Sequence, residues 1–372
     1  MAEILFVTWD GGGNVPPALG IAAELQSRGH GVRVLGHASQ QDSLAVAGYE
    51  VAPARQAREF SALDTNSPLA LVSMFGDRGL GRDVLDALAD RPAEVVVVDC
   101  LLFGVMAELR EAGTPYVVLE HLYDAYLTDG WMKGPMGQGM RLKRLHPTRS
   151  LAEARLRLVA SLPTLDPAGA GRRHNLAYVG PVVPFSARAE ADPMVLVSLS
   201  TFRFPKMAQC LQTILDACAG LDARVVVTTG PVVDPAELRV PANAEVHRFV
   251  PHAELMPGAS LVIGHGGHGT TMQALAHDVP LVLMPMHPML DQPMVARSVE
   301  AAGAGRVVPK KAAAADLTPV IAALLADGPH RAAAARLGAE IRSMPGARNA
   351  ADRIESLLKD GAPTSEHPAA RP

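Results

Sequence analysis

The chain has 372 residues, of which 48% are hydrophobic and 19% are charged. This length suits about two domains, and the apolar content excludes a largely disordered chain. The formal net charge of -4 argues against a nucleic-acid-binding protein that depends on phosphate contacts.

Neither targeting signals nor cysteine motifs stand out. No basic segment precedes an apolar one at the N-terminus, so no secretory signal is expected. The strongest apolar run, Val95–Met106, contains an aspartate and is too short to cross a bilayer. Cys100, Cys210 and Cys218 lack metal-ligand spacing. We therefore expect a cytoplasmic protein with buried thiols and no membrane partner.

Short apolar runs alternate with helical patterns in the first half. Ile4–Thr8 is predicted to be a buried strand, followed by the glycine-rich turn Asp10–Asn14 and a helix over Pro16–Ser27. Further strands are predicted at Val32–Gly36, Val95–Val98 and Tyr116–Glu120, with a helix over Leu102–Glu111. This alternation predicts an open parallel sheet.

The periodicity fades between Pro163 and Pro193, which marks a linker. It restarts with strands at Val195–Leu199, Arg224–Thr228, Leu261–Gly264 and Leu281–Pro285, and with helices over Met207–Ala219, Thr270–His277 and Ala350–Lys359. The predicted organisation is an N-terminal domain (1–180), a linker (181–193), a C-terminal domain (194–349), a helix (350–360) packing back on the N-terminal domain, and a disordered tail (361–372).

The first glycine loop, Asp10–Asn14, lies where dinucleotide folds place a phosphate turn. Its spacing is not GxGxxG, because Pro16 takes the place of the third glycine. No acidic residue follows the second strand to bind a ribose, which argues against a dehydrogenase. The absence of a P-loop lysine excludes a P-loop nucleotidase.

The second glycine loop, Gly264–Thr271, follows a strand and opens a helix. Its glycines, hydroxyls and helix-start amides suit a diphosphate, and His265 could donate a hydrogen bond and balance charge on a leaving group. Asp291 and Gln292 suit adjacent sugar hydroxyls, because a carboxylate accepts and an amide donates. The alternatives are a turn with two solvated histidines and an exposed helix cap.

The segment His247–Gly305 closely resembles the donor-binding signature of family-1 glycosyltransferases, as do Val195–Thr201, Tyr178–Pro181 and Pro17–Leu25 elsewhere in the chain. The resemblance implies an α/β fold of the GT-B type, with two Rossmann-like domains facing each other across a cleft. It implies inverting transfer from a TDP- or UDP-sugar, as co-substrate without further cofactor, to a small hydrophobic natural-product acceptor. No metal cluster is evident, so we expect metal independence. We also expect no nucleic-acid partner, and a monomer or homodimer.

The resemblance also implies residue roles in the C-terminal half. Backbone groups near Val250 would meet the nucleobase, and Asp291 and Gln292 would hold the sugar. The residues expected around the diphosphate are His265, Gly267, His268, Gly269, Thr270, Ser198, Ser200 and Thr201. Two positions depart from the family: Ser200 stands where glycine is usual, and His252 where glutamine is commoner.

The acceptor half departs further. The family's usual base is a histidine three residues before the proline that opens the first helix, and Asn14 occupies that place. An amide cannot take a proton at neutral pH. Asp99 falls where the family keeps the aspartate that orients the histidine. Three hypotheses remain: Asp99 or Asp10 is the base, His121 supplies the imidazole, or the chain is an auxiliary nucleotide-sugar-binding protein with little or no transfer.

Each of these residues also has a structural interpretation. Asp99 could cap a helix, His121 could be a satisfied core histidine, Asp10 could shape its loop, and Asn14 is expected to cap the first helix. An epimerase on the same fold is a second enzymatic alternative. The segment Asp124–Arg155 is expected to be irregular and to form part of an acceptor pocket, with Met132, Met136 and Met140 against an apolar aglycone, or to be only a surface loop.

Overall fold

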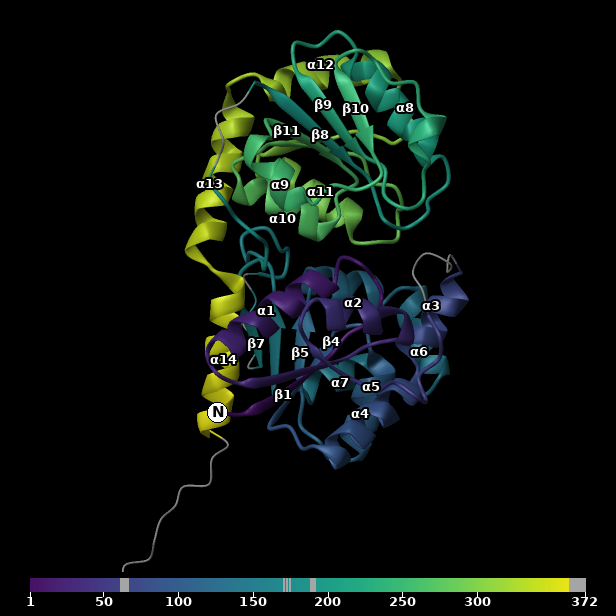
Figure 1. Ribbon diagram of the computed structural model, residues 1–372, viewed down its shortest axis with the longest axis vertical. Helices are drawn as coiled ribbons and strands as arrows, with labels where there is room; N and C mark the ends of the chain where they lie inside the picture. Colours follow the sequence, from purple (N-terminus) through teal and green to yellow (C-terminus); the bar gives the residue numbers. More distant parts are fainter. Residues whose placement is uncertain (61–66, 170, 172, 174, 188–191, 361–372) are drawn as a thin grey trace, which may run out of the picture.

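The computed structural model describes residues 1–372 apart from 61–66, 170, 172, 174, 188–191 and 361–372. Two parallel sheets, each covered by helices, form two domains, and the helices α13 (Pro329–Ser343) and α14 (Gly346–Asp360) run along one side of both (Figure 1). The predicted disordered tail, 361–372, and part of the predicted linker, 188–191, lie outside the described residues.

The first sheet has seven strands in the order β3-β2-β1-β4-β5-β6-β7, all paired in parallel. Its strands are β1 (Glu3–Val7), β2 (Gly31–Leu35), β3 (Glu50–Ala52), β4 (Val95–Asp99), β5 (Val117–Glu120), β6 (Leu156–Val159) and β7 (Leu176–Tyr178). Its helices include α1 (Val15–Ser27), α2 (Gln41–Val46), α3 (Pro68–Phe75), α4 (Arg78–Asp90), α5 (Phe103–Glu111), α6 (Pro135–Leu142) and α7 (Pro147–Ala152). The short helices η1 (Ala38–Gln40) and η2 (Tyr126–Trp131) lie in loops.

The second sheet has six parallel strands in the order β10-β9-β8-β11-β12-β13. Its strands are β8 (Met194–Ser198), β9 (Arg224–Thr228), β10 (Ala244–His247), β11 (Leu261–Gly264), β12 (Leu281–Leu283) and β13 (Gly305–Val307). Its α-helices are α8 (Met207–Cys218), α9 (His252–Leu255), α10 (His268–Ala276), α11 (Gln292–Ala301), α12 (Ala314–Leu325) and α13 (Pro329–Ser343), and its 3₁₀ helices are η3 (Pro235–Glu237) and η4 (Met256–Gly258).

Branched apolar residues explain why these strands are buried on both faces. The run Val95–Val98 of β4 is at most 5% exposed, and its side chains enter two different cores on the two sides of the sheet. Such continuous apolar runs are typical of parallel sheets covered by helices. The predicted strand positions agree with the structure to within one or two residues.

The last helix, α14 (Gly346–Asp360), packs on α1 of the first domain. Ile354 lies in the same core as Ile21, and Arg28 donates to Asp352 at 2.6 Å and to Glu355 at 3.0 Å. The chain therefore crosses between the domains twice.

These two crossings touch each other. Gly180, at the first crossing, has a φ of +94°, and a Cβ there would lie 2.1 Å from the carbonyl oxygen of Met344 at the second. A Cβ on Gly346 would lie 2.3 Å from the carbonyl oxygen of Gly180. Glycine is thus required on conformational and on steric grounds where the backbones meet.

The strand order reverses between β1 and β4 in the first sheet and between β8 and β11 in the second. Open α/β sheets bind ligands beyond the carboxyl ends of the strands at such points. A ligand is therefore expected beside the residues that follow these four strands.

The segment 124–155 differs from its prediction. It contains η2, α6 and α7 rather than irregular structure. Met132 and Met140 are buried in the core, and Met136 packs against it. Among the described residues, no helix has the length and apolarity needed to cross a membrane.

Candidate active site

Asp99, the last residue of β4, is buried and surrounded by hydrogen-bond donors. Its Oδ1 accepts from Trp9 Nε1 at 3.1 Å and from the Leu101 amide at 3.0 Å. Its Oδ2 lies 3.3 Å from Asn14 Nδ2 and 3.0 Å from His121 Nδ1. Because both oxygens are engaged, this carboxylate is arranged to orient its neighbours rather than to accept a substrate proton.

His121 follows β5 and lies beside Asp99 because β4 and β5 are adjacent strands. A carboxylate only accepts, so Nδ1 carries the proton that faces Asp99. Nε2 has no hydrogen-bond partner among the residues that the structure describes. Burial lowers the pKa of His121, but the charge and hydrogen bond of Asp99 outweigh burial and hold it above its usual value. The neutral form is therefore an oriented imidazole with a free basic nitrogen.

Asn14 does not cap the first helix, which corrects the prediction. It precedes α1, but its side chain forms no capping hydrogen bond. Its amide nitrogen instead donates to Thr8 Oγ1 at 3.1 Å, to the Trp9 carbonyl at 3.0 Å and to Asp99. Three surrounding acceptors fix the orientation of the amide, since the oxygen could not occupy that position. Asn14 thus ties Asp99 to the loop after β1.

Asp10 is directed elsewhere. Its carboxylate accepts from Ser39 Oγ at 3.3 Å, on the loop after β2. The same hydroxyl lies 2.9 Å from the Phe60 carbonyl, so the two acceptors share its single proton. This geometry supports the interpretation that Asp10 shapes its loop, and the structure shows no contact between its carboxylate and Asp99 or His121 among the described residues.

Cys100 adds a thiol to the group, with Sγ 3.7 Å from His121 Nδ1. Asp99, Cys100 and His121 offer ligand atoms within 4.8 Å of one another, a set that could hold a metal ion. Burial raises the pKa of the Cys100 thiol well above its usual value, so it is protonated at neutral pH. A metal ion would have to displace the proton of this thiol and that of His121 Nδ1 before it could bind here.

The loop after β11 approaches α11 closely. Gly266 has a φ of +82°, and a Cβ there would lie 2.9 Å from the carbonyl oxygen of Gln292. Among the described residues, no atom of another segment lies within 4 Å of the position that a Cβ on Gly269 would take. The first-turn amides of α10, including those of Gly269 and Thr270, have no partner within the helix and so can face an anion.

His265, on the same loop, is neutral at pH 7. Burial, followed by the nearby His252, lowers its pKa to about 4. A neutral imidazole can donate one hydrogen bond to a diphosphate but cannot balance its charge. The neutral ring suits the predicted hydrogen-bonding role, whereas the predicted charge-balancing role would require the diphosphate to raise this pKa. Gly267 lies against this ring, since a Cβ there would be 2.5 Å from His265 Nε2.

His268 points toward the other domain. Its Nε2 lies 3.0 Å from Ser161 Oγ, and the ring of Tyr123 meets it edge-on at 5.5 Å. Burial, followed by the charge of His121, lowers the pKa of His268 to about 3. The imidazole is thus neutral and engaged by the first domain.

Asp291 and Gln292 lie at the start of α11, but Asp291 forms no capping bond. Burial raises the pKa of Asp291 to about 6, while His121 across the domain boundary lowers it. Gln292 is 3% exposed, and its carbonyl oxygen accepts from the amides of Met286 at 2.8 Å and His287 at 3.2 Å. The exposed-cap interpretation is therefore wrong, and for Gln292 only the amide NH₂ remains to meet a ligand.

The loop after β8 meets the first glycine loop. Ser198 ends β8 and is buried, and Ser200 Oγ accepts from the Phe202 amide at 3.0 Å. A Cβ on Gly12 would lie 3.2 Å from Thr201 Oγ1, so the two switch-point loops are in contact. Val250 is half-buried between β10 and α9. The candidate residues from both domains thus lie along one boundary.

Two residues of the candidate site were not predicted from the sequence. Trp9 donates to Asp99, and Tyr126 Oη donates to the Met289 carbonyl at 3.0 Å, two residues before Asp291. The position of Trp9 directly after β1 was a usable signal, because strand ends at a switch point face the ligand. Nothing in the sequence indicated the partner of Tyr126.

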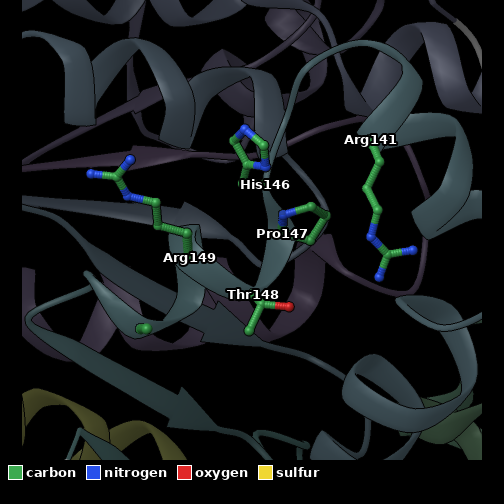
Figure 2. Close-up of a pocket in the computed structure, with 6 residues that line it drawn as sticks. Arg141, His146, Pro147, Thr148 and Arg149 are labelled. Carbon is green, nitrogen blue, oxygen red and sulfur yellow. The ribbon is translucent and has the colours of Figure 1, made fainter.

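A separate hollow of about 430 Å³ lies on α6 and α7, among Arg141, His146, Pro147, Thr148, Arg149 and Ala152. Figure 2 shows that the two arginine side chains extend away from each other. Arg149 is also paired with Glu153. The charged groups do not converge, so this hollow does not compete with the site at the domain boundary.

Known proteins resemble the chain over nearly its whole length. The family described as erythromycin biosynthesis protein CIII-like, C-terminal domain, matches residues 212–357. The 4'-demethylrebeccamycin synthase of Lentzea aerocolonigenes is 27% identical, with 96% of this chain and 100% of that protein aligned.

Solved structures share the fold. The calicheamicin glycosyltransferase CalG4 superposes with a TM-score of 0.79 at 24% identity, covering 98% of this chain and 100% of that one. The spinosyn rhamnosyltransferase SpnG, complexed with thymidine diphosphate, gives a TM-score of 0.70 at 21% identity, covering 96% of this chain and 100% of that one.

Proposed function

We propose that the chain is a family-1 glycosyltransferase of the GT-B fold, of the natural-product type that acts on nucleotide sugars. On that premise it transfers a sugar with inversion, without a metal, to a small hydrophobic acceptor, and His121 is the base. The donor would be a TDP- or UDP-sugar, and no further cofactor is needed. The observation that carries the choice of base is the 3.0 Å pair between His121 Nδ1 and Asp99.

The proposed reaction is a single displacement at the anomeric carbon. His121 Nε2 takes the proton of the acceptor nucleophile as that atom forms its bond to the sugar, and Asp99 stabilises the imidazolium that results. The bond to the diphosphate breaks on the opposite face. The amides at the start of α10 and a hydrogen bond from His265 stabilise the departing diphosphate.

The sugar would lie between His121 and Asp291. The charge of each of these two residues shifts the pKa of the other, so they lie near each other across the domain boundary. Asp291 would accept from one sugar hydroxyl and the Gln292 amide would donate to the next.

The auxiliary-protein hypothesis depended on the amide at position 14. In the proposed mechanism the His121–Asp99 pair supplies a base from another strand end, so the amide at position 14 is no longer a reason to expect an inactive protein. Asp99 and Asp10 are weaker candidates for the base, because Asp99 accepts from four donors and Asp10 accepts from Ser39.

Thermal unfolding with TDP, UDP, GDP and NAD, each with and without magnesium, tests the donor half. A nucleotide at 100 times its Kd should raise the stability by about 2.7 kcal/mol. We expect stabilisation by TDP or UDP, unchanged by magnesium or by EDTA. Stabilisation by GDP or NAD alone, or only with magnesium, would contradict the proposal.

Incubation of TDP- and UDP-sugars with a panel of apolar alcohols and phenols tests the transfer half. The expected product has an anomeric configuration opposite to that of the donor, read from its proton coupling constant. Consumption of nucleotide sugar without any acceptor would favour the epimerase instead.

A further inference from the structure

Two side chains of the first domain contact His268, where the second glycine loop of the other domain meets α10. His268 is the first residue of α10, and its Nε2 lies 3.0 Å from Ser161 Oγ. Ser161 is fully buried and His268 is 8% exposed, so this hydrogen bond is formed away from solvent. The Tyr123 ring, also fully buried, packs edge-on against the imidazole at 89°.

The same first-domain residues are joined to the base. Tyr123 follows His121 by two residues in the segment after β5. Ser161 follows β6, and the preceding amide, that of Ala160, donates to the Glu120 carbonyl at 2.8 Å. Glu120 is the residue directly before His121, so both contacts of His268 lead back to the backbone that carries the base.

We propose that His268, Ser161 and Tyr123 form an interdomain strut that sets the position of the diphosphate-binding helix relative to His121. This inference rests on the proposed function. It assigns His268 to positioning rather than to direct donor binding, because its Nε2 is already engaged by Ser161 and its ring is covered by Tyr123. A neutral imidazole also supplies no positive charge to a diphosphate.

The consequence for the reaction is geometric. An in-line displacement needs the nucleophile, the anomeric carbon and the leaving oxygen in one row, with the first from one domain and the last from the other. A misplacement of about 1 Å can cost about 100-fold in rate. Loss of the strut is therefore expected to lower kcat while leaving the affinity for the nucleotide nearly unchanged.

Ser161→Ala is the sharpest test, because it removes the strut's hydrogen bond from the domain that does not bind the donor. We expect kcat to fall by about 10- to 100-fold, with the Kd for TDP changed less than about 2-fold in calorimetry. Ser161→Thr keeps the hydroxyl and should restore kcat. Ser150→Ala, a buried serine of α7 outside the site, is the matched control and should match the wild type.

A second measurement does not depend on transfer. Spin labels on Asp42→Cys in α2 and Asp222→Cys before β9, both at exposed positions, report the distance between the domains. The described native cysteines, Cys100, Cys210 and Cys218, are buried. Ser161→Ala should broaden the distance distribution, and Ser161→Thr should narrow it again.

The outcomes separate the two proposals. An unchanged kcat and an unchanged distance distribution in Ser161→Ala would overturn the strut. A loss of TDP affinity as large as the loss of kcat would also overturn it, because His268 would then act on donor binding. A wild type that binds TDP yet transfers to no acceptor, together with the expected broadening of the distance distribution in Ser161→Ala, would overturn the proposed function alone.

Discussion

The two glycine loops of this protein follow β1 and β11, each of which is one of the two strands at the switch point of its sheet, yet the loops act by different means. The loop after β11 offers backbone: glycines, a sharp turn and the start of a helix. The loop after β1 offers side chains, because Trp9 and Asn14 both donate to Asp99. A backbone anion site is local in sequence, whereas the proposed base is assembled from three strand ends.

The largest expected effect comes from the group of side chains around Asp99. His121→Ala removes the proposed base, so kcat should fall by about 10²- to 10⁴-fold while TDP still binds. Steady-state kinetics together with TDP calorimetry check this. His146→Ala, an exposed histidine beside α7, is the control. Retention of wild-type kcat in His121→Ala would return the role of base to Asp99 or Asp10.

The backbone site in the loop after β11 is tested through two side chains that are proposed to bind the same donor. Asp291→Ala and His265→Ala each remove a hydrogen bond to the donor and should lower kcat/KM by about 10- to 100-fold, at roughly 1.4–2.7 kcal/mol per lost contact. The two variants should unfold at the wild-type temperature. Full activity in both would show that the donor site is assigned wrongly.

The smallest expected effect is a shift in the pH dependence of the transfer activity. His121 must be neutral to act as base and its pKa lies above the ordinary value, so activity should fall as the pH drops through that pKa. Asp99→Asn removes the charge that raises this pKa, and the acid limb should move to lower pH. The rate at the optimum should also fall, because the oriented partner of Nδ1 is lost. An acid limb that stays in place would show that another group titrates.

Strand positions, both glycine loops and the family resemblance could be predicted because each is encoded in a continuous stretch of sequence. The role of His121 could be named only as one of three hypotheses, and its pairing with Asp99 was not predicted. It depends on β4 and β5 being neighbours in the sheet, a fact of topology that no local pattern contains.

Side-chain direction was the least predictable property. The glycine-rich pattern places His268 beside the diphosphate amides, but its ring turns to Ser161, which lies 107 residues earlier in the chain. Asn14 stands at a capping position and instead bonds to Asp99, since three acceptors surround its amide nitrogen. In both cases a distant partner decides the role.

The contact between the two chain crossings at Gly180 and Gly346 has a mechanical consequence. Two connections placed far apart would lock the domains against each other, whereas two that touch act as a single pivot. Opening to admit substrates would then be a rotation about this point, largest at the far edge and smallest beside it. A bulky side chain at either glycine would hinder this rotation without contacting any group of the proposed reaction.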